Sequence, residues 1–272
     1  METVSAHTKK AYDAMWAWVE ETGLDVNQPD EVVEAITAKW PNLNTRKTKL
    51  AYLIGFLKKT PEFNNEAVLK AYQDKLAALV VEFGNKKVVQ EATEKEKNNW
   101  LSWTEVLEAA KKIKKHFYKS ITDLENAILI SLYTDMVPTR NDYSFLGFDE
   151  KSPNWLDLYS GNITIREHKT AKTEGELKRT VPITTLVMIH LLLEKDKTRK
   201  TLFLDTEANL STRLIRLFEK HTGKKIGSTM LRHIYLTEQQ KGEKTVVEKQ
   251  ELAKSMGHCV QTQAQYRRPE LE

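Results

Sequence analysis

The stretch NITIREHKTAKTEGELKRTVPI, residues 162–183, differs from the segments around it in the spacing of its apolar side chains. Apolar residues alternate with polar ones in NITIREHK and again in LKRTVPI, and the polar segment KTAKTEGE, which holds one glycine, lies between. Alternation with a period of two on both sides of a polar turn predicts two antiparallel strands. We therefore expect a small antiparallel sheet in this part of the chain.

Helical spacing dominates on both sides of this region. Tyr12, Met15, Trp16 and Val19 recur at intervals that place them on one helix face, and Gly23 follows as an end signal. The same periodicity predicts helices over residues 45–57, 67–83, 104–117, 122–133, 186–195, 211–221, 229–240 and 246–256. The sequence therefore predicts a mostly α-helical protein with one small antiparallel β-sheet, an α+β fold.

A polar, charged stretch, NKKVVQEATEKEKNNW at residues 85–100, separates two groups of predicted helices. Its composition is typical of a linker. The sequence therefore predicts a helical domain over residues 1–84, a linker over 85–99 and a second domain over 100–272 that contains the sheet.

The composition is that of a globular protein with nearly balanced charge. Of the 272 residues, 40% are hydrophobic, which is enough to fill a core. The 42 basic and 38 acidic side chains leave a net charge of +4, which indicates a nucleic-acid partner only weakly. Because the single cysteine, Cys259, cannot form an internal disulfide, we expect an intracellular protein of the cytoplasm or nucleus.

Several classes of protein are disfavoured by the absence of their patterns. The longest apolar stretch, residues 181–193, is interrupted by Pro182 and His190 and is shorter than the roughly 20 residues that span a bilayer. The opening METVSAHTKK lacks the apolar core of a signal peptide. The seven histidines and one cysteine show no zinc-type spacing, and no glycine-rich phosphate loop is present. We expect no membrane partner, no metal and no other cofactor.

Cutting a DNA strand without a metal makes specific demands on side chains. Negative charge gathers on the phosphate oxygens, so several fixed cations must point at one phosphorus atom. Arginine suits this task because its planar fork reaches two oxygens and keeps its proton, whereas lysine can act as an acid. A tyrosine beside guanidinium groups can serve as the nucleophile because they favour the phenolate.

Four separated stretches offer such groups: PTRNDY at 138–143, HKTAKTEG at 168–175, STMLRHIYLT at 228–237 and MGHCVQTQAQYRR at 256–268. In this order they resemble the signature of the tyrosine recombinases and type IB topoisomerases. That signature has an arginine, a lysine on a β-hairpin, a His-x-x-Arg box, a His or Trp after a Leu-Gly-like pair, and a tyrosine shortly behind it. The resemblance covers roughly residues 100–266, and PTRNDY and MLRHIY resemble the branch found in large DNA viruses and their mobile elements.

The resemblance implies a role for each matching residue. Arg140 and Arg232 look like the two phosphate-binding arginines, His258 like the hydrogen-bond donor of the third box, and Tyr266, eight residues later, like the nucleophile. Asp142 resembles the acid that braces the first arginine, although it could equally form a cap or face water.

Two lysines could be the hairpin acid. We favour Lys169, which ends the predicted strand NITIREHK, and Lys172 is the alternative.

One position departs from the family pattern. Thr229 stands three residues before Arg232, where the family has histidine or lysine, and a hydroxyl offers a hydrogen bond but no charge. Because adjacent helical residues point about 100° apart, His233 should not reach the place that Thr229 faces, and we expect it to pack in the core.

Other cations are candidates for contacts to DNA phosphates or are simply solvated. They are Arg46, Lys47 and Lys49 at the start of one predicted helix, Lys178 and Arg179 on the second strand, and Arg267 beside the tyrosine.

The resemblance implies an enzyme that breaks and rejoins double-stranded DNA through a 3′-phosphotyrosine, in recombination or integration. It implies a two-domain clamp around the duplex, in which the first domain is a core-binding domain, and a tetramer on two duplexes. A type IB topoisomerase that relaxes supercoiled DNA shares this chemistry and is the nearest alternative. A DNA-binding protein that has kept the fold and lost catalysis is another, which Thr229 would suit.

Overall fold

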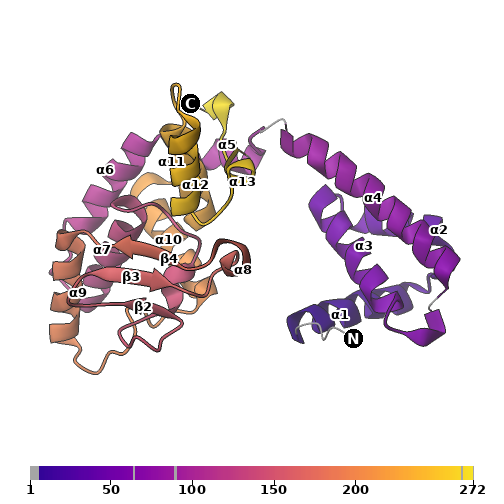
Figure 1. Cartoon of the computed structure of the whole chain (residues 1–272), viewed down its shortest axis with the longest axis horizontal. Helices are drawn as coiled ribbons and strands as arrows, with labels where there is room; N and C mark the ends of the chain where they lie inside the picture. The colour runs from indigo at the N-terminus through magenta and orange to yellow at the C-terminus, as the bar shows by residue number, and fades with distance from the viewer. Residues whose placement is uncertain (1–5, 64, 89–90, 265, 272) are drawn as a thin grey trace. The chain divides into compact units, whose positions relative to one another are not determined.

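The computed structural model of the chain describes residues 6–63, 65–88, 91–264 and 266–271, and it divides into two compact units (Figure 1). The first unit is Met1–Val89 and the second is Gln90–Glu272. Each unit has a hydrophobic core of its own. The limit between them falls inside the stretch that the sequence predicts as a linker.

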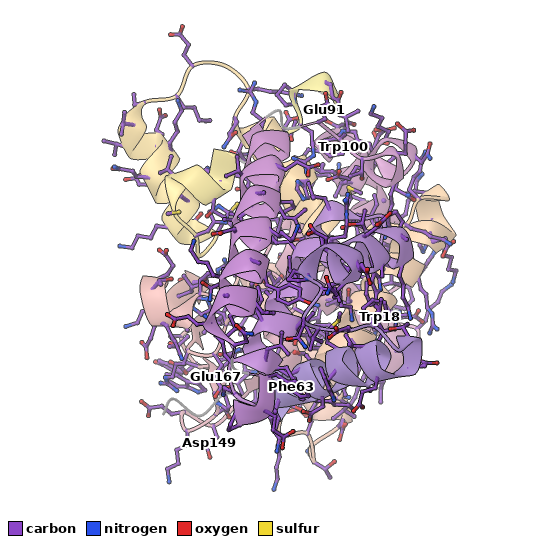
Figure 2. All side chains as sticks on the ribbon, turned by 90° about the vertical axis from the view of Figure 1, so that its right-hand side faces the viewer. Trp18, Phe63, Glu91, Trp100, Asp149 and Glu167 are labelled. Atoms are coloured by element: carbon purple, nitrogen blue, oxygen red, sulfur yellow. The ribbon has the colours of Figure 1, made fainter. Side chains whose placement is uncertain are left out.

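Helices build the described part of the first unit. They are α1 (Ala6–Thr22), α2 (Pro29–Lys39), α3 (Leu43–Leu57) and α4 (Glu66–Val88), with a 3-10 turn, η1 (Pro61–Phe63), between the last two. Trp18 belongs to the buried core and Phe63 packs against it, and Figure 2 labels both. The buried Tyr72 hydroxyl donates a hydrogen bond to the Val26 carbonyl at 3.0 Å, which ties α4 to the connection between α1 and α2.

Two helix limits near the predicted linker differ from the prediction. Helix α4 continues to Val88, beyond the predicted end at Phe83. Within the predicted linker, Glu94–Asn99 form a short helix, α5, because Thr93 and Glu96 make a reciprocal capping box. The Thr93 hydroxyl accepts from the Glu96 N–H, and the Glu96 carboxylate accepts from the Thr93 N–H. A charged residue of the predicted linker, Glu96, therefore caps the start of a helix.

The second unit is also mostly helical. After α5 it contains the long helices α6 (Trp103–Lys114), α7 (Ile121–Thr134), α9 (Ile183–Lys195), α10 (Glu207–Thr222), α11 (Ser228–Gln239) and α12 (Val246–Ser255). Short elements are η2 (Asp142–Phe145), α8 (Ala171–Glu174), α13 (Val260–Ala264) and η3 (Pro269–Leu271). Helix α7 packs against α6 and α9 and is buried at every position from Ala127 to Thr134, so it forms the centre of this core.

A small sheet lies among these helices (Figure 1). Its strands are β1 (Leu146–Gly147), β2 (Asn154–Leu156), β3 (Asn162–Ile165) and β4 (Leu177–Thr180), in that spatial order. The pairs β2–β3 and β3–β4 are antiparallel, whereas β1–β2 is parallel. The mostly helical fold with one small sheet is confirmed, but the sheet is mixed where the sequence predicted an antiparallel one, because a strand pair before residue 162 had not been predicted.

The strand predicted to reach Lys169 ends at Ile165. Beyond Ile165 the backbone bonds to a side chain instead of to a neighbouring strand. The Asn154 side-chain oxygen accepts from the N–H groups of Arg166 and Glu167, both at 2.9 Å. The chain then forms α8 within the segment predicted as a simple turn, and Gly175 follows with φ +70°. Lys169 therefore lies in the connection between β3 and β4, four residues after the strand has ended.

Arg179, on strand β4, connects β4 to two other segments of the unit by hydrogen bonds. The Arg179 guanidinium donates hydrogen bonds to the Val137 carbonyl, to the Tyr143 hydroxyl at 3.2 Å and to the Ser255 carbonyl at 2.6 Å. The first two partners flank Arg140 in the chain, and Ser255 ends α12. Arg179, which the sequence assigned to DNA phosphates or solvent, instead links three segments of the unit.

The turn after α12 depends on a glycine. Gly257 has φ +66°, a left-handed conformation that residues with a Cβ adopt at a cost. A Cβ on Gly257 would also lie 2.8 Å from Leu177 Cδ1, on β4. The turn that leads to His258 is therefore fixed by backbone conformation and by its close approach to the sheet.

No helix among the described residues is long and apolar enough to cross a membrane.

We expect Gly257→Ala to lower the free energy of unfolding more than Gly223→Ala does. Gly223 has φ +72° at the end of α10, and a Cβ there meets no described atom within 4 Å. Gly223→Ala therefore measures the cost of the left-handed backbone conformation alone, about 1–2 kcal/mol. At residue 257 the Leu177 side chain must move as well. Urea denaturation of both variants measures the difference, and equal losses would show that the contact with Leu177 does not matter.

Candidate active site

The site is centred on a buried arginine. Arg232 lies in the middle of α11 and is only 1% exposed. Its guanidinium donates to the Met256 carbonyl at 3.4 Å and to His258 Nδ1 at 3.0 Å. Its Nε is buried and has no hydrogen-bond partner among the described residues. A buried charged donor without an acceptor is costly, by roughly 1–3 kcal/mol or more, so this geometry favours an anion at the site.

His258 presents a second buried donor. It follows the Gly257 turn and is 2% exposed. An arginine can only donate, so His258 Nδ1 accepts and the ring proton of the neutral imidazole lies on Nε2. Burial, and then the charges of Arg232 and Arg140, lower the pKa of His258 to about 3, so the ring is neutral at physiological pH. Nε2 is buried and has no partner among the described residues.

Tyr266 lies against both of these groups. Its ring stacks on His258 with 5.4 Å between the centroids, and the Arg232 Cζ lies 5.0 Å from the centre of the phenol ring. Burial acts to raise the pKa of the Tyr266 phenol, but the charges of Arg232 and Arg140 and the hydrogen bonds from both guanidinium groups outweigh it. The pKa is therefore lowered, which makes the phenolate easier to form than on an exposed tyrosine.

Arg140 approaches from the loop after α7. The Tyr133 and Thr139 hydroxyls both donate to its carbonyl, the second at 3.1 Å, which fixes the backbone at this position. The Arg140 charge affects the pKa of Tyr266, of His258 and of Asp142, so its guanidinium lies close to all three groups. Arg140, Arg232, His258 and Tyr266 thus come together from separate stretches of the chain.

Asp142 lies near the same cluster. Burial raises the pKa of its carboxyl, and the charges of His168, Arg140 and Arg232 offset part of that increase. Asp142 therefore lies near the first arginine, as expected, but the described residues show no hydrogen bond between the Asp142 and Arg140 side chains.

The connection between β3 and β4 is attached to the turn that carries His258. The Thr170 hydroxyl donates to the Gly257 carbonyl at 2.6 Å, and His168 Nε2 donates to the Gly175 carbonyl at 2.8 Å. Lys169 and Lys172 lie on either side of Thr170, and both side chains are exposed. Both lysines therefore remain candidates for the acid.

The remaining predicted positions are more dispersed. Thr229 is exposed in the first turn of α11, three residues before Arg232. Lys178 is exposed on β4, whereas Arg267 is half-buried.

In the first unit, Lys47 Nζ lies 4.1 Å from the centre of the Phe83 ring and Lys49 Nζ lies 5.0 Å from that of Trp40. Arg46 donates to the Pro41 carbonyl at 3.4 Å. Lys39, which the sequence did not single out, also lies over the Trp18 and Trp40 rings at 5.2 and 5.3 Å. The three lysines make cation–π contacts and Arg46 makes a hydrogen bond, so all four cations are partly engaged with their own unit.

Sequence reasoning missed the contribution of His233. It was expected to pack in the core and it is buried, but its Nδ1 also donates to the Tyr266 carbonyl at 2.8 Å. The ion pair that Glu96 and Arg268 form at 2.9 Å, close to His233, was also missed. The only sequence signal for Glu96 was the capping-box spacing Thr-x-x-Glu at residues 93–96.

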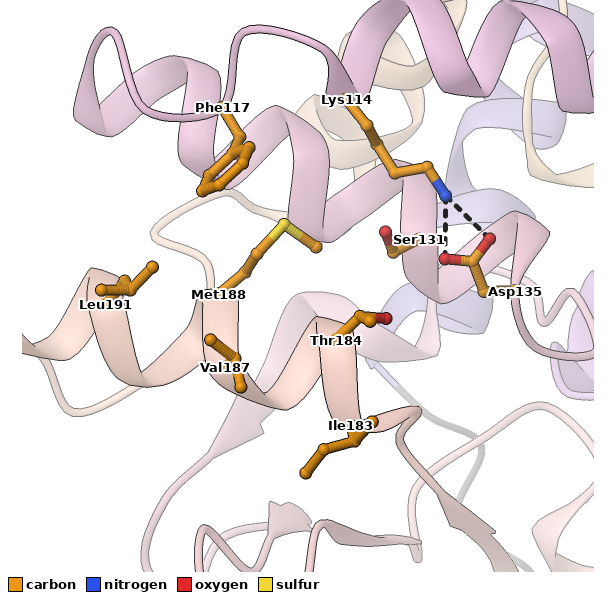
Figure 3. Close-up of a pocket in the computed structure, with 9 residues that line it drawn as sticks. All are labelled: Lys114, Phe117, Ser131, Asp135, Ile183, Thr184, Val187, Met188 and Leu191. Carbon is orange, nitrogen blue, oxygen red and sulfur yellow. Dashed lines mark hydrogen bonds and ion pairs between the residues drawn. The ribbon is translucent and has the colours of Figure 1, made fainter.

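An apolar depression of about 540 Å³ lies on another face of the second unit, where α6, α7 and α9 meet (Figure 3). Its apolar lining includes Phe117, Ile183, Val187, Met188 and Leu191. Its two charged side chains, Lys114 and Asp135, neutralise each other in a 2.8 Å ion pair. This depression therefore offers no cation for a phosphate. The described residues include no group of three or more His, Cys, Asp or Glu side chains that could hold a metal ion.

Comparisons with known proteins gave similarity to solved structures. No family model matches the sequence, and no curated protein matches it. Among solved structures the chain is similar to that described as "Crystal structure of XerA recombinase", with 12% identity over 95% of this chain and 93% of the other, and a TM-score of 0.47. At this identity and TM-score the similarity does not assign a function.

We expect one phenol of the folded protein to titrate at lower pH than an exposed tyrosine, whose pKa is about 10. The difference between the ultraviolet titrations of the native protein and Tyr266→Phe isolates that phenol. Arg140→Gln should move its titration to higher pH because one favourable cation is lost. Lys197→Gln removes an exposed cation elsewhere and should leave it in place. A phenol that titrates at the ordinary pH in the native protein would contradict the site geometry.

Proposed function

We propose that this chain breaks and rejoins DNA strands through a covalent 3′-phosphotyrosine, as a tyrosine recombinase. The observation that carries the proposal is a pair of buried donors, Arg232 Nε and His258 Nε2, that have no partner among the described residues and lie beside a phenol whose pKa is lowered. A phosphodiester has the oxygens that these donors lack, and its phosphorus is the atom that a phenolate would attack. The proposed reaction is therefore phosphoryl transfer, and the resemblance of the four stretches to the tyrosine recombinases makes DNA the proposed substrate.

The reaction forms one bond and breaks one. The Tyr266 phenolate oxygen attacks phosphorus, and the bond from phosphorus to the 5′-oxygen breaks with its electron pair on that oxygen. Lys169 or Lys172 supplies the proton that makes the departing oxygen a 5′-hydroxyl. Arg140, Arg232 and His258 donate to the non-bridging oxygens, whose charge grows in the transition state, and Thr229 can add a neutral hydrogen bond.

The covalent intermediate decides the outcome. The aryl phosphate keeps the energy of the broken bond, so a 5′-hydroxyl can attack it without an external energy source. Attack by the hydroxyl of another strand gives recombination or integration, and attack by the original one only restores the strand. Recombination between two duplexes requires several copies of the chain, and we propose a homo-oligomer, a tetramer in the simplest case, on double-stranded DNA.

Cations outside the site would bind the flanking DNA backbone. Lys178 is exposed on the strand next to the β3–β4 connection, and Lys47 and Lys49 lie on the first unit. Contacts of this kind are made to phosphates and carry no base information, so they would give affinity that falls steeply with salt.

Incubation with a nicked suicide duplex, from which the cleaved end diffuses away, tests the proposal. We expect the native chain to form a protein–DNA adduct that survives denaturant, and Tyr266→Phe to form none. Arg232→Gln should slow adduct formation by about 10²- to 10³-fold, because one transition-state donor is lost. A native chain that binds the duplex and forms no adduct would favour the inert DNA-binding alternative, and an equal adduct with Tyr266→Phe would exclude Tyr266 as nucleophile.

The acid can be identified with a duplex that carries sulfur in place of the 5′-bridging oxygen. A thiolate leaves without a proton because a thiol has a pKa of about 8.5. We expect Lys169→Ala to slow cleavage of ordinary DNA by about 10²-fold or more and to cleave the sulfur substrate as fast as the native chain does. Lys172→Ala is the matched comparison, and the acid is Lys172 if only that variant is rescued. If neither variant is rescued, no lysine of this connection supplies the proton.

A further inference from the structure

The chain that follows Tyr266 folds back onto its own unit. Arg268 donates from both Nε and Nη2 to a single Glu96 oxygen, Oε1, at 3.2 and 2.9 Å. The Arg268 and Glu96 side chains are only 11% and 12% exposed. The Glu270 carboxylate accepts from the N–H of Ala92, so a second contact joins the same two segments. Because this ion pair is largely shielded from water and has two donors on one acceptor, its two side chains attract each other more strongly than those of an exposed surface pair.

Helix α11 holds the same segment at two points. His233 Nδ1 donates to the Tyr266 carbonyl at 2.8 Å, and the Thr237 hydroxyl oxygen accepts from the Arg268 N–H at 3.0 Å. His233 and Thr237 are four residues apart, so they lie one turn apart on one helix face. Both are buried. The backbone from Tyr266 to Arg268 is therefore fixed at both ends by the helix that also carries Arg232.

Glu96 uses its two oxygens for different tasks. Oε2 accepts from the N–H and the hydroxyl of Thr93, at 2.8 and 2.9 Å, in the capping box of α5. Oε1 is left for Arg268 and also lies 3.6 Å from His233 Nε2. Because the capping box already fixes the carboxylate, Arg268 binds to an oxygen whose position is set in advance.

We propose that Glu96, His233 and Thr237 form a clamp on residues 266–268 that positions the Tyr266 phenol against Arg232. The clamp acts through the backbone and touches neither substrate nor phosphate, so its members are positioning residues. This inference rests on the proposed function for its effect on cleavage, but the placement of the phenol can be measured without DNA. It also gives α5, at the start of the second unit, a role in the site.

Glu96→Gln tests the clamp because a glutamine retains an oxygen for the capping box and loses the charge that binds Arg268. Its matched control is Glu105→Gln. Glu105 occupies the same capping-box position on α6, where its Oε2 accepts from the Ser102 N–H and hydroxyl at 2.7 and 2.8 Å. Both substitutions remove one negative charge from a helix cap, and only the first lies beside Arg268.

Two measurements are needed. Without DNA, Glu96→Gln should raise the pH at which the Tyr266 phenol titrates, because the phenol moves away from the two arginines. With saturating nicked duplex, it should slow adduct formation by about tenfold to a hundredfold while DNA affinity stays unchanged. Glu105→Gln should match the native chain in both. A Glu96→Gln variant that matches Glu105→Gln in both measurements would overturn the clamp.

His233 offers a rescue test. The amide nitrogen of an asparagine takes the place of His Nδ1, so His233→Asn should keep the bond to the Tyr266 carbonyl and much of the cleavage rate, whereas His233→Leu should lose both. Equal cleavage rates in these two variants would also contradict the clamp. If the native chain forms no adduct, the proposed function fails, and the phenol titration still decides whether the clamp positions Tyr266.

Discussion

The burial of the Arg232 guanidinium is the constraint on which the rest of the second unit depends. A charge removed from water is costly unless hydrogen bonds and counter-charges replace the lost hydration. Here the hydrogen-bond partners of the guanidinium are a backbone carbonyl, the Nδ1 of His258 at 3.0 Å and the Tyr266 phenol, and Nε has none among the described residues. The arrangement leaves the arginine with donor capacity for an anion.

Backbone carbonyls hold the separate parts of the site together. Arg179 binds the Val137 and Ser255 carbonyls, each three residues before a predicted site residue, and Thr170 binds the carbonyl of Gly257. These donors lie on β4 and in the β3–β4 connection. The small sheet therefore sets the distance between the Arg140 loop and the His258 turn. That is a structural reason for a sheet inside a helical unit.

The proposed nucleophile, Tyr266, is held by contacts to its own backbone segment. They come from α11 and α5, through the Tyr266 carbonyl, the Arg268 N–H and the Arg268 guanidinium, and α11 also carries Arg232. A tyrosine side chain loses conformational freedom when it is fixed, and the contacts that already hold the backbone from Tyr266 to Arg268 reduce the amount that must be lost during the proposed reaction. The Thr229 hydroxyl lies exposed in the first turn of the same helix, so the one departure from the family pattern does not disturb this support.

The sequence by itself determined most of the long helices, although not α2, together with the presence of a small sheet near residues 162–183 and the candidate residues that gather around the site. Periodicity over a few turns shows which face of a helix is buried, and the order of the four stretches predicted the chemistry that we propose. The sequence could not show that Asn154 would end a strand at Ile165, that Arg179 would bind inward, or that Glu96 would meet Arg268. Those contacts join residues 12, 76 and 172 positions apart in the chain, and local spacing contains no information about them. Only the packed tertiary structure decided these contacts. In each of them, burial removes water from a polar group, and a partner inside the protein takes the place of that water.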